Sequence, residues 1–143
     1  MNELEIKNLF EQGYNCGQVV LTYYAEKLNL DEEMALKITS GLGGGMFSGD
    51  SCGAVVAAVI AIGLKYGYYE ESDLKVSKDL CTAKTLQFRH EFSEKFGSCM
   101  CKELLEYDIS IPEEKEKIFA SGKLLEFCPC LVKEAINILD EIL

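Results

Sequence analysis

Hydrophobic side chains recur along most of this sequence at intervals of three and four residues, the spacing of an amphipathic helix. Near the end of the chain, for example, Val132, Ala135 and Ile136 share one face, while Lys133 and Glu134 occupy the other. No segment shows the alternation that predicts a strand. The pattern therefore predicts six or seven helices, placed at Glu3–Gln12, after the cap Asn15, after the cap Asp31, at Cys52–Tyr66, from the cap Ser72 to about Phe96, at Cys99–Tyr107 and from Pro129 onward.

Serine residues mark three predicted helix starts. Ser51 and Ser98 stand where their side chains can cap the helices that follow. Ser110-Ile-Pro-Glu113 has the order of a capping box, with proline in the first turn. The helix boundaries are thus predicted from polar caps as well as from hydrophobic spacing.

The segment 52–66 differs from the others because it carries no charged residue from Cys52 to Leu64. A helix that is hydrophobic all round belongs in the interior of a bundle. Its small residues share one face and allow a neighbouring helix to approach closely; they are Ala54, Ala57, Ala58 and Ala61. The sequence therefore predicts an all-α, compact single domain over residues 1–143, built around this buried helix.

A glycine-rich stretch precedes this helix, with six glycines among the 13 residues from Gly41 to Gly53. No regular element tolerates that density, so the stretch predicts a loop whose backbone takes unusual angles or closely approaches another group. The run lacks the Gly-Lys-Ser/Thr ending and the preceding strand of a phosphate-binding loop. Tight packing is therefore the better interpretation.

Charge and composition narrow the function classes. The formal net charge is −10, from 24 acidic and 14 basic residues, which argues against nucleic acid as a partner and against an anionic membrane surface. The N-terminus has no basic or apolar signal segment, and the most apolar stretch, 54–64, is too short to span a bilayer. We therefore expect a soluble cytoplasmic protein without membrane insertion.

Seven cysteines are the main chemical feature of the chain. An odd number of cysteines, in a sequence without an export signal, argues against a scaffold of structural disulfides. The remaining roles for these cysteines are metal binding, redox chemistry and burial in the core. Cys81 is predicted mid-helix, where burial in the core is expected. Because helix N-termini stabilise a thiolate, lowered pKa values are expected for cysteines placed there. Six fall at the N-termini of four predicted helices: Cys16, Cys52, Cys99, Cys101, Cys128 and Cys130.

The cysteine spacing excludes several familiar sites. Cys-x-x-Cys is absent, so a zinc knuckle, a thioredoxin-type motif and a c-type haem attachment are not expected. Cys-x-Cys occurs twice, and because positions i and i+2 of a helix point about 200° apart, one member of each pair should serve a site. His90, the single histidine, lies between Arg89 and Glu91, where a solvated position is expected. A histidine-rich metal site is therefore excluded.

Five ordered motifs carry a family resemblance that extends from about Asn15 to Val132. They are Asn15-Cys16, Gly41-Leu-Gly-Gly-Gly45, Cys52-Gly53-Ala54, Phe96-Gly97-Ser98 leading to Cys101-Lys-Glu-Leu-Leu105, and Cys128-x-x-Leu131-Val132. This arrangement resembles the C_GCAxxG_C_C family of redox-active proteins, which is related to a domain of split-Soret cytochromes. Ala57 departs from the pattern, because the family motif has glycine there; alanine still permits close packing. The haem-binding segment of the cytochrome relatives is absent.

The resemblance implies one site in which four cysteines converge, serving as redox-active thiols or as metal ligands. The matching positions are Cys16, Cys52, Cys101 and Cys128. Around them we expect a loop made by Gly43, Gly44, Gly45 and Gly53, with N–H groups of the glycine run near the Cys52 sulfur.

Three functions fit such a site. The leading hypothesis is a redox protein whose four thiolates hold an iron–sulfur centre for electron transfer or sensing, as the kinship with cytochromes implies. The alternative is a metal-free thiol–disulfide oxidoreductase. The third is a helical binding module held by zinc, the less expected metal. No haem is expected. The sequence does not identify the redox partner protein, and it is compatible with a homodimer through the small-residue helix or the terminal helix.

Overall fold

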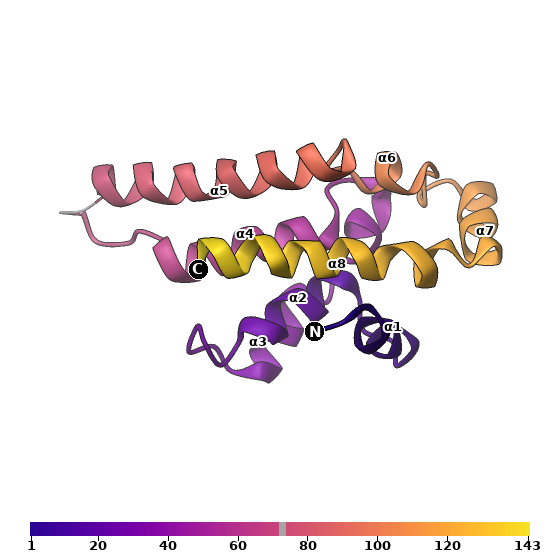
Figure 1. Cartoon of the computed structure of the whole chain (residues 1–143), viewed down its shortest axis with the longest axis horizontal. Coiled ribbons are helices and arrows are strands. Elements are labelled where there is room, and N and C mark those ends of the chain that lie inside the picture. Colours follow the sequence, from indigo (N-terminus) through magenta and orange to yellow (C-terminus); the bar gives the residue numbers. More distant parts are fainter. Residues whose placement is uncertain (72–73) are drawn as a thin grey trace.

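The computed structural model describes residues 1–71 and 74–143. Within these residues the fold is all-α, as predicted, and has no strand (Figure 1). The helices are α1 (Glu3–Glu11), α2 (Cys16–Tyr24), α3 (Glu32–Thr39), α4 (Gly53–Tyr66), α5 (Leu74–Phe96), α6 (Cys101–Leu105), α7 (Pro112–Ser121) and α8 (Lys123–Ile142), with a short helical segment η1 (Gly45–Gly49) before α4. The predicted cap Ser72 lies outside the described residues. No described helix combines the length and the apolar character that a membrane span requires.

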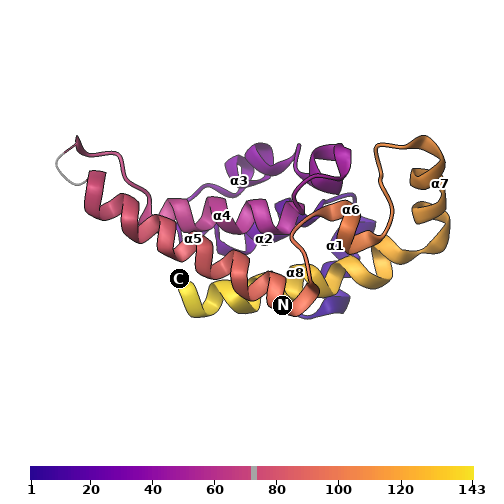
Figure 2. The ribbon, with the colours of Figure 1, turned by 90° about the horizontal axis from the view of Figure 1, so that it is seen from above.

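The three longest helices, α4, α5 and α8, pack against one another in the middle of the molecule (Figures 1 and 2). Helix α2 covers α4, α1 packs on α8, and α3 packs on α2. As predicted, α4 is the buried helix, and its four small residues are fully enclosed: Ala54, Ala57, Ala58 and Ala61. The small-residue face is therefore packed against other helices of the same chain.

Polar caps set the starts of the first three helices. Asn2 caps α1 and Asn15 caps α2, each accepting a hydrogen bond from the N–H three residues further on. Glu5 and Gln18 complete two capping boxes by accepting bonds from the N–H groups of these caps. Asp31 caps α3, as predicted. Such caps satisfy N–H groups that have no partner within the helix, which explains why these helices begin where the sequence indicated.

The last helix begins at Lys123 rather than at Pro129, so this predicted start is wrong. Gly122, at a left-handed φ of 73°, ends α7 and precedes α8. Proline is favoured in a first turn, but here Pro129 is buried inside the helix. The free energy gained by burying a long apolar face exceeds the cost of the backbone hydrogen bond that proline cannot donate. Cys128 and Cys130 consequently lie in the interior of α8 and not at a helix N-terminus.

The predicted caps Ser51 and Ser98 do not form. Ser51 pairs with Met100 in an isolated antiparallel bridge, and α4 begins after Cys52 without a side-chain cap. Ser98 accepts a hydrogen bond from the Met100 N–H at 2.9 Å, and α6 begins at Cys101, two residues later than predicted. A contact between distant segments has therefore replaced the local caps, which sequence patterns cannot reveal.

The predicted capping box at Ser110 is also absent, although proline does occupy the first turn of α7. The N–H of Ser110 donates to Asp108 Oδ1 at 2.9 Å, and the Ser110 hydroxyl contacts the same oxygen at 2.5 Å. Helix α7 begins at Pro112 after Ile111, which provides no side-chain cap. Ser110 thus belongs to the turn before the helix, because serine and aspartate form local turns as readily as caps.

Only the C-terminal half of α5 is buried. Phe88 and Phe92 are fully buried and stack with ring centroids 5.9 Å apart, while Phe96 lies 4.9 Å from Phe92. Cys81 is partly buried against the core, which agrees with its predicted packing role. Leu74, the first residue of the helix, is 40% exposed. The N-terminal half of α5 therefore extends beyond the helices that cover it (Figure 1).

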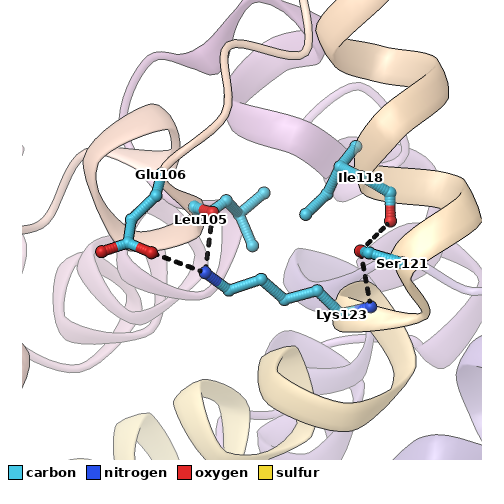
Figure 3. A network of polar contacts seen from close by, with 5 residues as sticks. All are labelled: Leu105, Glu106, Ile118, Ser121 and Lys123. Atoms are coloured by element: carbon cyan, nitrogen blue, oxygen red, sulfur yellow. Dashed lines mark hydrogen bonds and ion pairs between the residues drawn. The ribbon is translucent and has the colours of Figure 1, made fainter.

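Lys123 ties the start of α8 to the end of α6 (Figure 3). Its ammonium group donates to the Leu105 carbonyl at 2.8 Å and pairs with Glu106 at 3.4 Å. Ser121 accepts a bond from the Lys123 backbone N–H at 3.2 Å and donates to the Ile118 carbonyl at 2.7 Å. A cation at the C-terminal end of a helix offsets its free carbonyl groups. The helices α6, α7 and α8 are thereby joined at one end of the molecule.

Candidate functional site

A pocket of about 540 Å³ opens where α2, α4 and α6 begin. Four cysteines from four different parts of the chain line it: Cys16, Cys52, Cys101 and Cys128. These are the four positions that the family resemblance selected. The other three cysteines are described by the structure and lie outside the pocket lining. The fold therefore brings together, at one cavity, residues that are far apart in sequence.

Cys16 and Cys52 meet because α2 and α4 begin at the same place. Cys16 is the first residue of α2, and Cys52 directly precedes α4. Two glycines allow this close approach. A Cβ atom built on Gly53 would lie 2.6 Å from Cys16 Sγ, and one on Gly17 would lie 3.1 Å from the Gly53 carbonyl oxygen. Larger side chains at these two positions would force the helix starts apart.

The bridge between the segments before α4 and α6 brings Cys101 to this site. The N–H of Cys52 donates to the Cys99 carbonyl at 2.8 Å, and the N–H of Cys101 donates to the Asp50 carbonyl at 2.7 Å. The Cys99 side chain is buried in the core, where its sulfur lies 3.2 Å from the Ser93 hydroxyl. Of this Cys-x-Cys pair, only Cys101 lines the pocket.

Cys128 reaches the pocket from the interior of α8. It packs against a small cluster that includes Cys101 and Leu105. Its neighbour Cys130 does not line the pocket, because side chains two positions apart point in nearly opposite directions on a helix. Helix geometry thus separates this Cys-x-Cys pair in the way that was expected, although neither member lies at a helix start.

The glycine run forms one wall of the pocket and has the unusual backbone that its composition predicted. The expected glycines all line the pocket: Gly43, Gly44, Gly45 and Gly53. Gly44 and Gly45 have left-handed φ values of 58° and 61°. Met46 and Phe47 continue this left-handed turn, with φ values of 58° and 55°. A Cβ atom on Gly45 would lie 2.5 Å from the backbone of Asp50, so the turn is possible only with glycine there.

The N–H groups that favour the thiolates come from the starts of both α2 and α4. Those of Ala54 and Val55 act on the Cys52 sulfur, and those of Gly17, Ala54 and Cys16 itself act on the Cys16 sulfur. The first N–H groups of a helix have no partner within it and are free to bind an anion. The start of α4 therefore takes the role that was expected of the glycine run.

The two adjacent thiols have opposite pKa shifts. The Cys52 thiol donates a hydrogen bond to Cys16, which lowers the pKa of Cys16 despite the opposing effect of burial. The same bond raises the pKa of Cys52, because it favours the protonated donor, and burial raises it further. Cys52 is buried, whereas Cys16 is partly exposed. Cys16 is therefore the more acidic and the more accessible thiol of the pair.

The expectation of lowered pKa values at six cysteines is wrong for most of them. Burial raises the pKa of Cys101 to about 11 and that of Cys128 well above its usual range. Burial also raises the pKa of Cys130. For Cys128 and Cys130 the predicted helix start does not exist, and for Cys101 the short helix does not compensate for desolvation. The helix-start argument thus holds only for Cys16.

The four pocket cysteines are also potential metal ligands. Among residues 1–71 and 74–143, no group of three or more His, Cys, Asp or Glu side chains is arranged to hold a metal ion. The four cysteines share a pocket but do not form a ready ligand shell in this conformation. His90 is solvated, as predicted, with its side chain 74% exposed and 4.0 Å from Glu94.

Aromatic residues of the pocket were not identified from the sequence. Tyr14, Phe47 and Phe119 all line it and remain partly or largely exposed. The position of Phe47, two residues after the glycine run, was an available signal, since a large apolar side chain is unusual in a loop. Phe119 has no such signal, because on the amphipathic α7 it resembles any other helix residue.

A comparison with protein families agrees with these observations. The model of the family described as "Putative redox-active protein (C_GCAxxG_C_C)" matches residues 14–142. Searches of curated proteins and of solved structures each find no match. The matched range contains all four pocket cysteines and nearly the whole fold. The chain belongs to the C_GCAxxG_C_C family of cysteine-rich, redox-active proteins.

Proposed function

We propose that the protein is a thiol–disulfide redox protein in which Cys16 and Cys52 alternate between two thiols and one disulfide. The contact between these two side chains, at the converging starts of α2 and α4, carries the proposal. Adjacent thiols need little backbone movement to form a disulfide. Oxidation of the pair transfers two electrons to an acceptor and releases two protons.

The two thiols have different roles in this proposal. Cys16 is partly exposed and has the lowered pKa, so its thiolate attacks a sulfur atom of the acceptor. Cys52 is buried and keeps its proton until the second step, when it attacks Cys16 and completes the disulfide. Cys101 and Cys128 stay protonated near neutral pH, which leaves Cys16 as the strongest nucleophile of the four.

Redox titration tests the proposal directly. The protein is equilibrated without oxygen in mixtures of reduced and oxidised dithiothreitol, trapped by alkylation and mapped by mass spectrometry. We expect a disulfide between Cys16 and Cys52 that appears in a single two-electron transition. A protein in which these two thiols remain reduced while other cysteines pair would contradict the proposal.

Cysteine variants test whether the two-electron transition belongs to Cys16 and Cys52 or to the remaining cysteines. Cys16→Ser and Cys52→Ser should each abolish the two-electron transition. Cys81→Ser is the matched control, because Cys81 lies on α5 outside the pocket, and it should leave the transition unchanged.

An iron–sulfur centre is the second candidate, favoured by the presence of all four cysteines at one pocket. Iron–sulfur ligation needs at least three of these side chains to turn toward a common point, an arrangement that the described residues do not have. Protein expressed with added iron and purified without oxygen distinguishes the two candidates. Iron with acid-labile sulfide, lost when Cys101 or Cys128 is replaced, would favour the cluster over the two-thiol mechanism.

Seven unpaired cysteines suit a reducing compartment, so we place the protein in the cytoplasm, where a dithiol partner protein can return the disulfide to thiols.

A further inference from the structure

The mouth of the cysteine pocket is lined by aromatic rings that solvent still reaches. Phe47 is 65% exposed and Phe119 is 58% exposed, although both line the pocket; Tyr14, which also lines it, is 38% exposed. Exposed rings gathered at a cavity with a volume typical of ligand sites indicate a surface made to contact an apolar group. Phe47 comes from η1 and Phe119 from α7, so the rings belong to different walls of the pocket.

Backbone strain accompanies the exposure of Phe47. Met46 and Phe47 are two successive non-glycine residues with left-handed φ values. Each costs about 1–2 kcal/mol relative to an ordinary helical conformation. Such strain persists where a function requires the position of a side chain, and here it places a large ring at the pocket rather than in the core.

The pocket has few charges. In the described part of the chain its charged lining residues are Glu11 and Lys115, one of each sign. The remaining lining is largely aliphatic and aromatic, with Leu104, Leu105 and Leu124 among its members. The protein as a whole carries a formal charge of −10, which repels anions. The apolar lining and the negative net charge both disfavour binding of a disulfide that carries carboxylates.

From these observations we infer that the pocket binds a small, uncharged disulfide with apolar, ring-bearing substituents, which Cys16 and Cys52 reduce. This inference rests on the proposed function and adds the substrate class. A cavity of about 540 Å³ accommodates a molecule of this kind, with its rings against Phe47 and Phe119 and its sulfur atoms at Cys16.

The exchange balances with the protein thiols as the reductant. The Cys16 thiolate attacks one sulfur of the disulfide, forms a mixed disulfide and releases the first substrate thiolate. Cys52 then loses its proton and attacks the Cys16 sulfur, which forms the Cys16–Cys52 disulfide and releases the second thiolate. One substrate disulfide becomes two thiols, and two electrons pass from the protein to the substrate.

Two aromatic disulfides of opposite charge type test the inference: uncharged 4,4′-dithiodipyridine and the dianionic 5,5′-dithiobis(2-nitrobenzoate). The rate at which each forms the Cys16–Cys52 disulfide in the reduced, full-length protein is measured by rapid quench and mass spectrometry. Each rate is divided by the rate of the same reagent with N-acetylcysteine amide, which removes intrinsic reactivity. We expect a normalised preference for the uncharged reagent of about tenfold or more. A preference below threefold would overturn the inference.

Variants distinguish pocket binding from general repulsion of anions. Phe119→Asp should slow the reaction with the uncharged reagent about tenfold, because a charge then stands where the ring should pack. Leu86→Asp is the matched control: Leu86 is 61% exposed, lies on α5 outside the pocket, and receives the same added charge. Equal effects of the two variants would contradict the inference.

The dithiothreitol titration distinguishes a failure of the inferred substrate class from a failure of the proposed function. Leu86→Asp should leave the two-electron transition unchanged, since Leu86 lies on α5 outside the pocket. An intact transition without any preference between the reagents would reject the substrate class alone. Absence of the transition in the unmodified protein would reject the thiol pair itself.

Discussion

Gly53 lies directly against the sulfur of Cys16, because a Cβ atom built on this glycine would stand 2.6 Å from Cys16 Sγ. The same atom would lie 2.6 Å from the carbonyl oxygen of Leu42. The glycine that follows Cys52 in the sequence therefore determines how closely the two thiols approach. It also makes the start of α4 sensitive to the smallest change in side-chain volume.

Gly53→Ala should lower the free energy of unfolding by about 1–3 kcal/mol, because the added methyl group displaces Cys16 and Leu42. It should also slow alkylation of Cys16 at neutral pH, since the hydrogen bond from Cys52 is stretched. Urea unfolding and mass spectrometry measure the two effects. Gly63→Ala in the same helix is the matched control: no atom lies within 4 Å of the added Cβ, so stability should rise by about 0.5–1 kcal/mol. Equal changes in both variants would argue against the close contact.

Cys52→Ala should raise the pKa of Cys16, because the hydrogen bond that lowers it is removed. Alkylation of Cys16 as a function of pH, followed by peptide mapping, should then show its inflection at a higher pH than in the unmodified protein. At pH 7 the rate should fall severalfold, in proportion to the lost thiolate. Cys81→Ala should leave the Cys16 profile in place. An unchanged profile in Cys52→Ala would show that the neighbouring thiol does not activate Cys16.

The reduced protein should lose stability between about pH 8.5 and pH 11. Burial raises the pKa of Cys101 to about 11, whereas an ordinary thiol in the unfolded chain titrates near 8.5. Between these values the folded state holds a proton that the unfolded state has released, so stability falls as pH rises. The raised pKa values of Cys52 and Cys128 act in the same direction, whereas the lowered pKa of Cys16 adds stability with rising pH only below about pH 8.5.

Urea unfolding under argon at pH 8 and pH 10.5 measures this loss. Cys101→Ala should reduce the difference between the two pH values, because the titrating group is absent. Identical pH dependence in the variant and the unmodified protein would mean that Cys101 is not held as a buried thiol.

Tyr24→Phe should destabilise the fold by about 1–3 kcal/mol. The buried Tyr24 hydroxyl lies 2.8 Å from the Ile136 carbonyl and 2.7 Å from Asp140, and so it connects α2 to α8. Removing it deletes both hydrogen bonds between α2 and α8. Tyr23→Phe is the control, because Tyr23 is 42% exposed, and it should change stability by less than about 0.5 kcal/mol. Thermal unfolding of both variants measures the difference, and equal melting temperatures would contradict the connection.

The sequence by itself was sufficient for the features that depend on local chemistry. The helical class, the caps Asn15 and Asp31 and the buried α4 follow from hydrophobic spacing, side-chain hydrogen bonding and the absence of charge. The unusual backbone near Gly44 follows from glycine density. Each of these depends on residues within a few positions of one another, so the pattern along the chain contains the necessary information.

Helix starts that depend on distant contacts could not be predicted. Pro129 lies inside α8 because burial of a long apolar face outweighs a missing hydrogen bond. Ser51 caps nothing because its segment pairs with Met100, which is remote in sequence. Local signals for a cap or a first turn compete with tertiary contacts, and the contacts are stronger here.

The sequence pattern and its family resemblance selected the four cysteines, but only the tertiary structure decided how they differ. Cys16 and Cys52 are in contact because glycines allow α2 and α4 to converge, and Cys101 joins them through a bridge between two loops. Their acidities diverge because the hydrogen bond between Cys16 and Cys52 favours the thiolate of Cys16 and the thiol of Cys52, while burial favours the thiol of Cys101. Burial and hydrogen bonds between distant residues depend on how remote segments of the chain pack together, and a local sequence pattern does not predict that packing.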